Sequence, residues 1–113
     1  MIVNTTRITV RAENRKELVQ TITSLLDPIR NEAGCLTHRL YQEAGNENSF
    51  LLVGEWETQV DWDNHLKSDN FAVLLGSISV LSNRREIDFK LLSHVTGLET
   101  VSKVRMWCDK QIG

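Results

Sequence analysis

The chain has 113 residues, with 15 acidic and 13 basic side chains and a formal net charge of -2. This length corresponds to one domain, and a content of 41% hydrophobic and 25% charged residues is ordinary for globular proteins. The composition excludes disordered, collagen-like and low-complexity classes, and the near-neutral charge provides no basic surface for nucleic acid or for an anionic membrane.

The chain also lacks the common signals for export, membrane insertion and cofactor binding. The N-terminal residues do not show the basic segment followed by an apolar segment that is typical of a secretion signal. No stretch approaches the roughly 18 apolar residues of a membrane span, so we expect a cytoplasmic protein. Cys35 and Cys108 have neither CxxC spacing nor a nearby histidine, which favours free thiols over a zinc site or a disulfide. Nucleotide-binding, zinc-protease and Ser-His-Asp motifs are missing, so we expect neither a metal nor a cofactor.

The first elements predicted are an alternating strand and an amphipathic helix. β-Branched and apolar residues alternate with polar ones over 2–10, which is typical of a half-buried strand. Asn14 begins a capping-box variant, and apolar residues then recur at helical spacing over 18–29. Pro28 is expected to kink this helix or to open a second short turn, and Gly34 to end it in a left-handed conformation.

A hairpin and two short helices follow. Residues 35–43 and 49–57 alternate on either side of a turn rich in Gly and Asn, which is the pattern of two antiparallel strands. Thr58 and Asp61 form a second capping box, and Ser68 provides a fresh N-cap. We therefore expect one short helix after Thr58 and another after Ser68.

A fourth strand is predicted over 85–95, where Phe89 and Leu91 lie on one face. The element order is that of an α+β ferredoxin-like domain, β-α-β-β-α-α-β, with an antiparallel sheet. We assign residues 1–95 to this domain and regard 96–113 as a C-terminal tail that docks on a partner subunit.

The predicted sheet has helices on one face only. Its other face includes apolar residues such as Leu51 and Val53. A small domain that exposes an apolar sheet face tends to associate with itself, so we expect a symmetric homodimer, sheet against sheet.

Three motifs resemble those of one known family. Gly34-Cys35-Leu36 lies at the end of the first helix, Glu55-Trp56-Glu57-Thr58 at the end of the third strand, and His65-Leu66-Lys67-Ser68-Asp69-Asn70-Phe71 in the second helical region. In this order, and with this pattern of elements over about residues 2–95, the chain resembles the antibiotic biosynthesis monooxygenase (ABM) superfamily.

The resemblance implies a dimeric α+β barrel with a pocket between each sheet and its helices. It implies no single activity, because the superfamily is functionally mixed. Its members include cofactor-independent oxygenases of quinol-like polyketide aromatics, quinol monooxygenases, haem-degrading enzymes and an isomerase of a signalling sugar derivative.

The chain departs from the family patterns at several positions. The second histidine of the helical motif is Asn70 here. The haem-degrading branch has an asparagine on strand one, a tryptophan on the second helix and a haem-ligating histidine further along, and the resemblance places Thr6, His65 and Leu75 at these positions. Because leucine cannot ligate iron, we do not expect haem degradation by that mechanism.

His65 is the candidate catalytic residue, because imidazole exchanges protons near neutral pH. The alternative is a half-buried histidine that caps or fills its helix face. Trp62 and Phe71 are candidates for an apolar substrate wall near His65, and Trp56 for the same wall from the end of a strand. Core packing is the alternative for all three aromatic residues.

Three polar strand residues are further candidates for substrate binding. Asn4 and Thr6 lie on the strand face that the helices should cover, where a polar side chain often marks a pocket. Local side-chain bonding is the alternative. His38 shares a face with Leu36 and Leu40 and is either a pocket residue or a satisfied buried histidine.

The leading functional hypothesis is a small homodimeric oxygenase that acts on a quinol-like or phenolic compound without a cofactor. His65 would accept or relay the substrate proton, and Asn4 or Thr6 would orient a substrate oxygen. A non-catalytic dimer that binds or senses a small molecule is one alternative, and an isomerase of the same superfamily is another, because fold does not fix function.

Overall fold

A computed structural model describes residues 1–82 and 87–93 of the chain. These residues form the predicted α+β ferredoxin-like arrangement, with a short 3-10 turn (Ala12–Asn14) before the first helix. The elements in chain order are β1 (Ile2–Thr9), α1 (Arg15–Arg30), β2 (Cys35–Gln42), β3 (Ser49–Trp56), α2 (Gln59–Leu66), α3 (Asp69–Leu81) and β4 (Asp88–Leu92).

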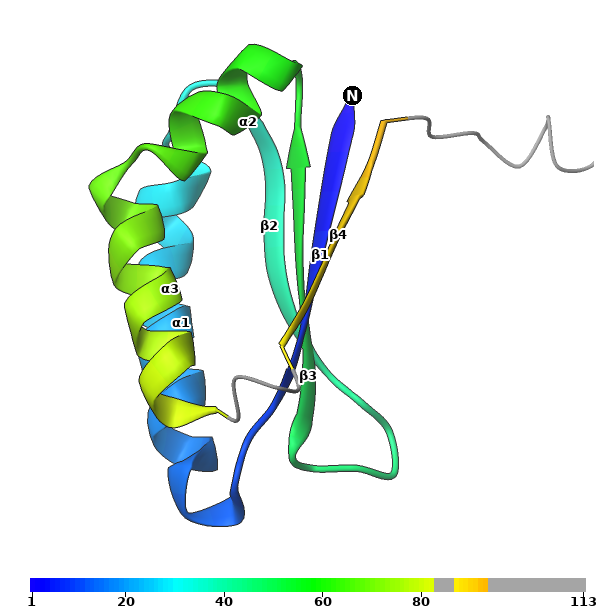
Figure 1. Ribbon diagram of the computed structural model, residues 1–113, viewed down its shortest axis with the longest axis vertical. Helices are drawn as coiled ribbons and strands as arrows, with labels where there is room; N and C mark the ends of the chain where they lie inside the picture. The colour runs from blue at the N-terminus through cyan, green and yellow to red at the C-terminus, as the bar shows by residue number, and fades with distance from the viewer. Residues whose placement is uncertain (83–86, 94–113) are drawn as a thin grey trace, which may run out of the picture.

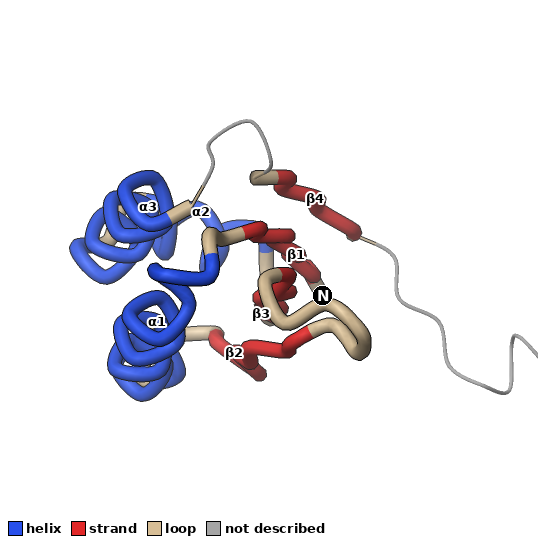
Figure 2. The backbone as a smooth tube through the Cα atoms, turned by 90° about the horizontal axis from the view of Figure 1, so that it is seen from below, coloured by secondary structure: helices blue, strands red, loops and turns tan. Residues whose placement is uncertain are grey.

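The four strands form one antiparallel sheet in the order β2-β3-β1-β4. On β1, Thr6 is paired with Leu52 of β3 on one side and with Phe89 of β4 on the other. Figures 1 and 2 show two layers, with α1 and α3 side by side over one face of this sheet. Within residues 1–82 and 87–93, no helix covers the opposite face.

The core lies between the sheet and the two long helices. Its apolar residues come from β1, α1, β3, α2 and α3, and alternate strand positions are buried as predicted for a sheet covered on one face. The buried set consists of Ile2, Ile8, Val10, Leu18, Ile22, Ile29, Phe50, Leu52, Trp56, Trp62, Leu74 and Ile78. Burial of this apolar surface is the main force that holds the layers together.

The start of α1 differs from the prediction. Asn14 precedes the helix, but its side chain makes no capping hydrogen bond. Its Nδ2 instead donates to the backbone oxygen of Leu81, 3.2 Å away at the end of α3. The side chain therefore joins two helices, a long-range contact that a local motif cannot reveal. Pro28 lies inside a single helix that runs through to Arg30, so no second turn begins there.

Gly34 has the predicted left-handed conformation, with φ of 80°, but it lies four residues after the last helical residue. A second constraint also requires glycine at this position. A Cβ atom built on Gly34 would lie 2.1 Å from Cγ of Asp61, on α2. The turn after α1 therefore packs directly on the start of α2.

The alternation predicted for 35–43 fails at its beginning. A register irregularity between Cys35 and Thr37 shifts the faces, so Leu36 is 51% exposed, whereas His38 is buried as the prediction requires. Cys35 packs against the core instead, and burial is the main cause that raises the pKa of its thiol. Its possible disulfide partner, Cys108, lies outside the described residues.

Both predicted caps after the hairpin are confirmed. Thr58 Oγ1 accepts from the backbone N–H of Asp61 at 3.2 Å, and Ser68 Oγ accepts from that of Phe71 at 3.1 Å. Each cap starts one short helix, α2 or α3.

The fourth strand covers Asp88–Leu92 and is shorter than the predicted range 85–95. Residues 83–86, the remainder of the predicted strand after 93 and the whole predicted tail lie outside the described residues. Among the helices of the described part, none is both long and apolar enough to cross a membrane.

Candidate functional site

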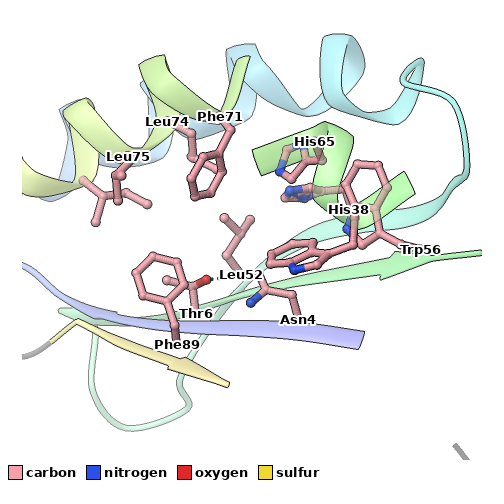
Figure 3. Close-up of a pocket in the computed structure, with 12 residues that line it drawn as sticks. Asn4, Thr6, His38, Leu52, Trp56, His65, Phe71, Leu74, Leu75 and Phe89 are labelled. Atoms are coloured by element: carbon pink, nitrogen blue, oxygen red, sulfur yellow. Dashed lines mark hydrogen bonds between the residues drawn. The ribbon is translucent and has the colours of Figure 1, made fainter. Parts of the chain in front are cut away.

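A cavity lies between the helical layer and the sheet, and it brings together all seven residues that the sequence singled out. Figure 3 shows Phe71, Leu74 and Leu75 reaching down from α3, while Asn4, Thr6 and Phe89 reach up from β1 and β4. The lining set is Asn4, Thr6, His38, Leu52, Trp56, Trp62, His65, Phe71, Leu74, Leu75, Ile78 and Phe89. Most of this wall is apolar or aromatic, and the two histidines and two strand residues supply its polar groups.

The free space inside the isolated subunit is small. The volume open to the centre of a water-sized sphere is about 10 Å³, which is enough for about one water molecule. An engineered apolar cavity that binds benzene measures roughly 150 Å³. Leu75 and Phe89 are 38% and 45% exposed, so the cavity reaches the surface between α3 and β4. An aromatic ring enters only if side chains at this rim move.

His65 lies in the last turn of α2, where its ring is almost fully buried and fixed by polar contacts on one edge. Its side chain is 2% exposed. Its Nδ1 lies 3.0 Å from both carboxylate oxygens of Glu32, which is itself 17% exposed. Asn70 Nδ2 donates to the same carboxylate, at 3.3 Å from Oε2. A histidine held by a carboxylate on one nitrogen is a common arrangement for proton transfer at the other.

Aromatic rings hold His65 from several other sides. The Trp56 ring stacks on it with a centroid distance of 4.4 Å and an interplanar angle of 27°. Phe71 meets it edge-on at 5.2 Å, and Trp62 lies at 5.7 Å. Trp56 is 1% exposed and also belongs to the core, so its packing role and its position in the cavity wall are compatible.

His38 is the second imidazole of the cavity, 6.0 Å from His65 between ring centroids. Desolvation by burial, followed by the charges of His65 and Arg30, lowers the pKa of His38 to about 4. The ring is therefore neutral at pH 7. Its buried Nδ1 has no hydrogen-bond partner among the described residues.

Asn4 and Thr6 are both buried, but much of their bonding capacity is used inside the protein. Thr6 Oγ1 donates to Asn4 Oδ1 at 3.3 Å, and Asn4 Nδ2 donates to the backbone oxygen of Lys90 at 3.2 Å. These bonds link β1 to β4 at the cavity floor. Local bonding, the alternative weighed for these residues, is thus present together with a position in the wall.

Sequence reasoning missed Glu32. It lies in the turn between α1 and β2, two residues before Gly34, and carries no motif of its own. Only the packing of this turn on α2 and α3 brings its carboxylate to His65 and Asn70. Within the described part of the chain, no three His, Cys, Asp or Glu side chains are grouped so that they could hold a metal ion.

Two known proteins are similar to this chain in sequence. A Bacillus subtilis protein named "Putative monooxygenase YcnE" is 30% identical over 71 residues, which cover 63% of this chain and 75% of that protein. The uncharacterized protein sll1783 of Synechocystis is 27% identical over 64 residues. That match covers 57% of this chain but only 44% of the Synechocystis protein, so it spans less than half of that relative.

The solved structures include a close match in fold. SnoaB of Streptomyces nogalater, described as a cofactor-independent oxygenase and solved as an asparagine-to-alanine mutant, has a TM-score of 0.75. The match covers 86% of this chain and 95% of SnoaB, at 18% sequence identity, and at that identity it shows a shared fold. The family model for antibiotic biosynthesis monooxygenase matches residues 1–74, so the chain belongs to the ABM family.

Proposed function

We propose that this protein is a cofactor-independent monooxygenase of a small, uncharged, quinol-like or phenolic compound. The single observation that carries the proposal is a buried histidine, bound to a carboxylate on one edge, in the wall of an aromatic cavity. Membership of the ABM family and the oxygenase description of SnoaB support the reaction type.

The proposed reaction needs only substrate, dioxygen and one base. His65 removes a proton from the substrate, and the electron-rich anion then reduces dioxygen directly. One oxygen atom of O2 ends in the product as a carbonyl and the other leaves as water. The substrate supplies all four electrons, as when a ring methylene becomes a ketone. Exclusion of water by Trp56, Trp62 and Phe71 favours this chemistry, because it keeps the anion from being reprotonated.

The polar groups of the cavity have separate roles in this proposal. His38 is neutral, so it offers a hydrogen bond to a substrate oxygen without adding a charge to the cavity. Asn4 and Thr6 form a polar floor that orients the same end of the ring. Among the described residues, the wall has no ionisable side chain besides His38 and His65, which suits an uncharged ring compound better than an anion.

The test is oxygen uptake by the purified protein with a panel of quinols and phenols. We expect uptake with at least one compound and a loss of about 10²–10⁴-fold in kcat for His65→Gln, the range that general base catalysis contributes. The matched control is Glu57→Gln, which changes an exposed carboxylate outside the cavity. Unchanged turnover in His65→Gln would exclude His65 as the base.

A non-catalytic binding or sensing protein is the second candidate, and the small volume of the cavity favours it. An interior with space for about one water resembles a packed core more than a prepared active site. Binding of a panel compound without oxygen uptake or product would establish this function. Product formation without oxygen uptake would instead establish the third candidate, an isomerase.

We also propose that two copies associate through the uncovered face of the sheet. Tyr41 is paired with Leu51 of β3, and Leu92 is paired with Val3 of β1, so both side chains lie on this face. Tyr41 is 48% exposed and Leu92 is 54% exposed. Light scattering should give a mass of about twice 12.9 kDa. Val53→Lys, on the same face, should produce the monomer, whereas Val73→Lys on the exposed side of α3 should not. A monomeric wild-type protein would contradict this proposal.

A further inference from the structure

Glu32 lies outside the cavity wall, yet it is held firmly against it. Its backbone N–H donates to the oxygen of Ile29 at 3.0 Å, and its own carbonyl oxygen accepts from the N–H of Cys35 at 3.2 Å. Gly34, in the same turn, approaches the side chain of Asp61 so closely that a Cβ there would clash. These contacts fix the distance between the turn and α2, and therefore between Glu32 and His65.

The hydrogen bonds around Glu32 determine where the proton on His65 lies. An ionised carboxylate can only accept hydrogen bonds. Both of its oxygens lie 3.0 Å from Nδ1 of His65, so with an ionised Glu32 this nitrogen is the donor and carries a hydrogen. Asn70 supplies a second donor to Oε2, and that bond also requires an accepting oxygen. Both neighbours therefore match an ionised Glu32 and an Nδ1–H imidazole.

The consequence for the cavity follows from the shape of the ring. Glu32 is absent from the cavity wall and His65 is part of it, so the Nδ1 edge faces the turn. In a neutral ring that carries its hydrogen on Nδ1, Nε2 on the other side has a free lone pair. The stacked Trp56 ring limits rotation about the side-chain bonds, so Nε2 stays directed away from Glu32.

We infer that Glu32 is a positioning residue, which selects the Nδ1–H tautomer of His65 and leaves Nε2 as the proton acceptor in the cavity. Asn70, at the position where the family pattern has a second histidine, holds the Glu32 carboxylate in place. A free imidazole prefers the opposite tautomer, with its hydrogen on Nε2, so the carboxylate reverses the intrinsic preference. The tautomer follows from this geometry and an ionised Glu32, and only the chemical use of Nε2 rests on the proposed function.

Nitrogen NMR of the substrate-free protein tests the tautomer directly. At about pH 9, well above the ordinary pKa of imidazole, the ¹⁵N shifts of His65 should show a protonated Nδ1 and an unprotonated Nε2. Glu32→Ala should move the hydrogen largely to Nε2, and Asn70→Ala should do so in part. Glu57→Ala, at an exposed glutamate, should change neither shift. A wild-type His65 protonated on Nε2 would overturn the inference, and this result needs no variant to fold.

Kinetics then separate this inference from the proposed function. With a compound that supports oxygen uptake, Glu32→Ala should lower kcat at least tenfold while KM stays within about twofold, because Glu32 does not touch the substrate. Glu32→Gln, which keeps one accepting oxygen, should recover part of the rate. If His65→Gln is fully active while the tautomer is as inferred, only the proposed function fails. If His65→Gln is inactive while Glu32→Ala changes neither the tautomer nor the rate, only the inference fails.

Discussion

Replacement of Gly34 by alanine tests the packing that builds the site. Gly34 and Gly45 both have positive φ angles, 80° and 85°. An L-residue in this conformation costs about 1–2 kcal/mol, and the reduced entropy of the unfolded chain offsets part of that cost. Gly45→Ala should therefore lose about 1 kcal/mol, because a Cβ there meets nothing within 4 Å.

Gly34→Ala should cost more, because its new Cβ would lie 2.1 Å from Cγ and 2.5 Å from Cβ of Asp61. Asp61 must shift, and its contacts with Thr58 at the start of α2 weaken with it. Loss of a cap costs about 0.5–2 kcal/mol and local overpacking about 1–3 kcal/mol. We expect Gly34→Ala to be about 2–4 kcal/mol less stable than Gly45→Ala.

Urea denaturation measures both variants on the same scale. The midpoint should fall for each, with the slope unchanged and the larger shift for Gly34→Ala. The same variant should also broaden or move the ¹⁵N signals of His65, because Glu32 lies in the displaced turn. Equal losses of stability for the two variants would refute the claim that the turn packs tightly on α2.

Three further predictions concern the site and its supports. The pKa of His38 is about 4 in the folded protein and near 6.5 in the unfolded chain. The free energy of unfolding is therefore highest above pH 6.5 and decreases as the pH falls towards 4, because the unfolded chain takes up the proton first. When the pH is lowered from 7.5 to 4.5, the free energy of unfolding measured in urea should fall by about 2–3 kcal/mol less for His38→Leu than for the wild type. An equal fall in both proteins would contradict the assigned burial of His38. Ser68→Ala removes the cap of α3 and should lower the free energy of unfolding by about 0.5–2 kcal/mol, whereas no change would exclude a capping role. Leu75→Ala should open the rim and tighten binding of a planar phenol by at least threefold in calorimetry, and weaker binding would place the entrance elsewhere.

The elements that depend on local signals were predictable from the sequence. Thr58 and Ser68 cap their helices with hydrogen bonds to residues three positions along the chain, so both helix starts were visible without a structure. The strands around Asn4 and Phe50 showed the period of two that one buried face imposes. The same periodicity placed Asn4 and Thr6 on the covered face, beside the cavity.

Features that depend on distant contacts were not predictable. Asn14 looked like a cap, but its amide bonds to Leu81, 67 residues away in sequence. The alternation places Leu36 on the same face as His38, but a register irregularity between Cys35 and Thr37 leaves Leu36 exposed. No sequence motif marks Glu32, because its carboxylate reaches His65 only through the packing of its turn on two helices. Long-range polar contacts of this kind leave no periodic trace in one sequence.

The measurement that tests the central claim most directly is the fate of ¹⁸O2 with the compound that gives the strongest oxygen uptake. After treatment with a chelator, the wild-type protein should place one ¹⁸O atom in each product molecule and one in water, and His65→Gln should lose this reaction by about 10²–10⁴-fold. Product that forms without ¹⁸O, or that forms as fast in His65→Gln, would contradict the account.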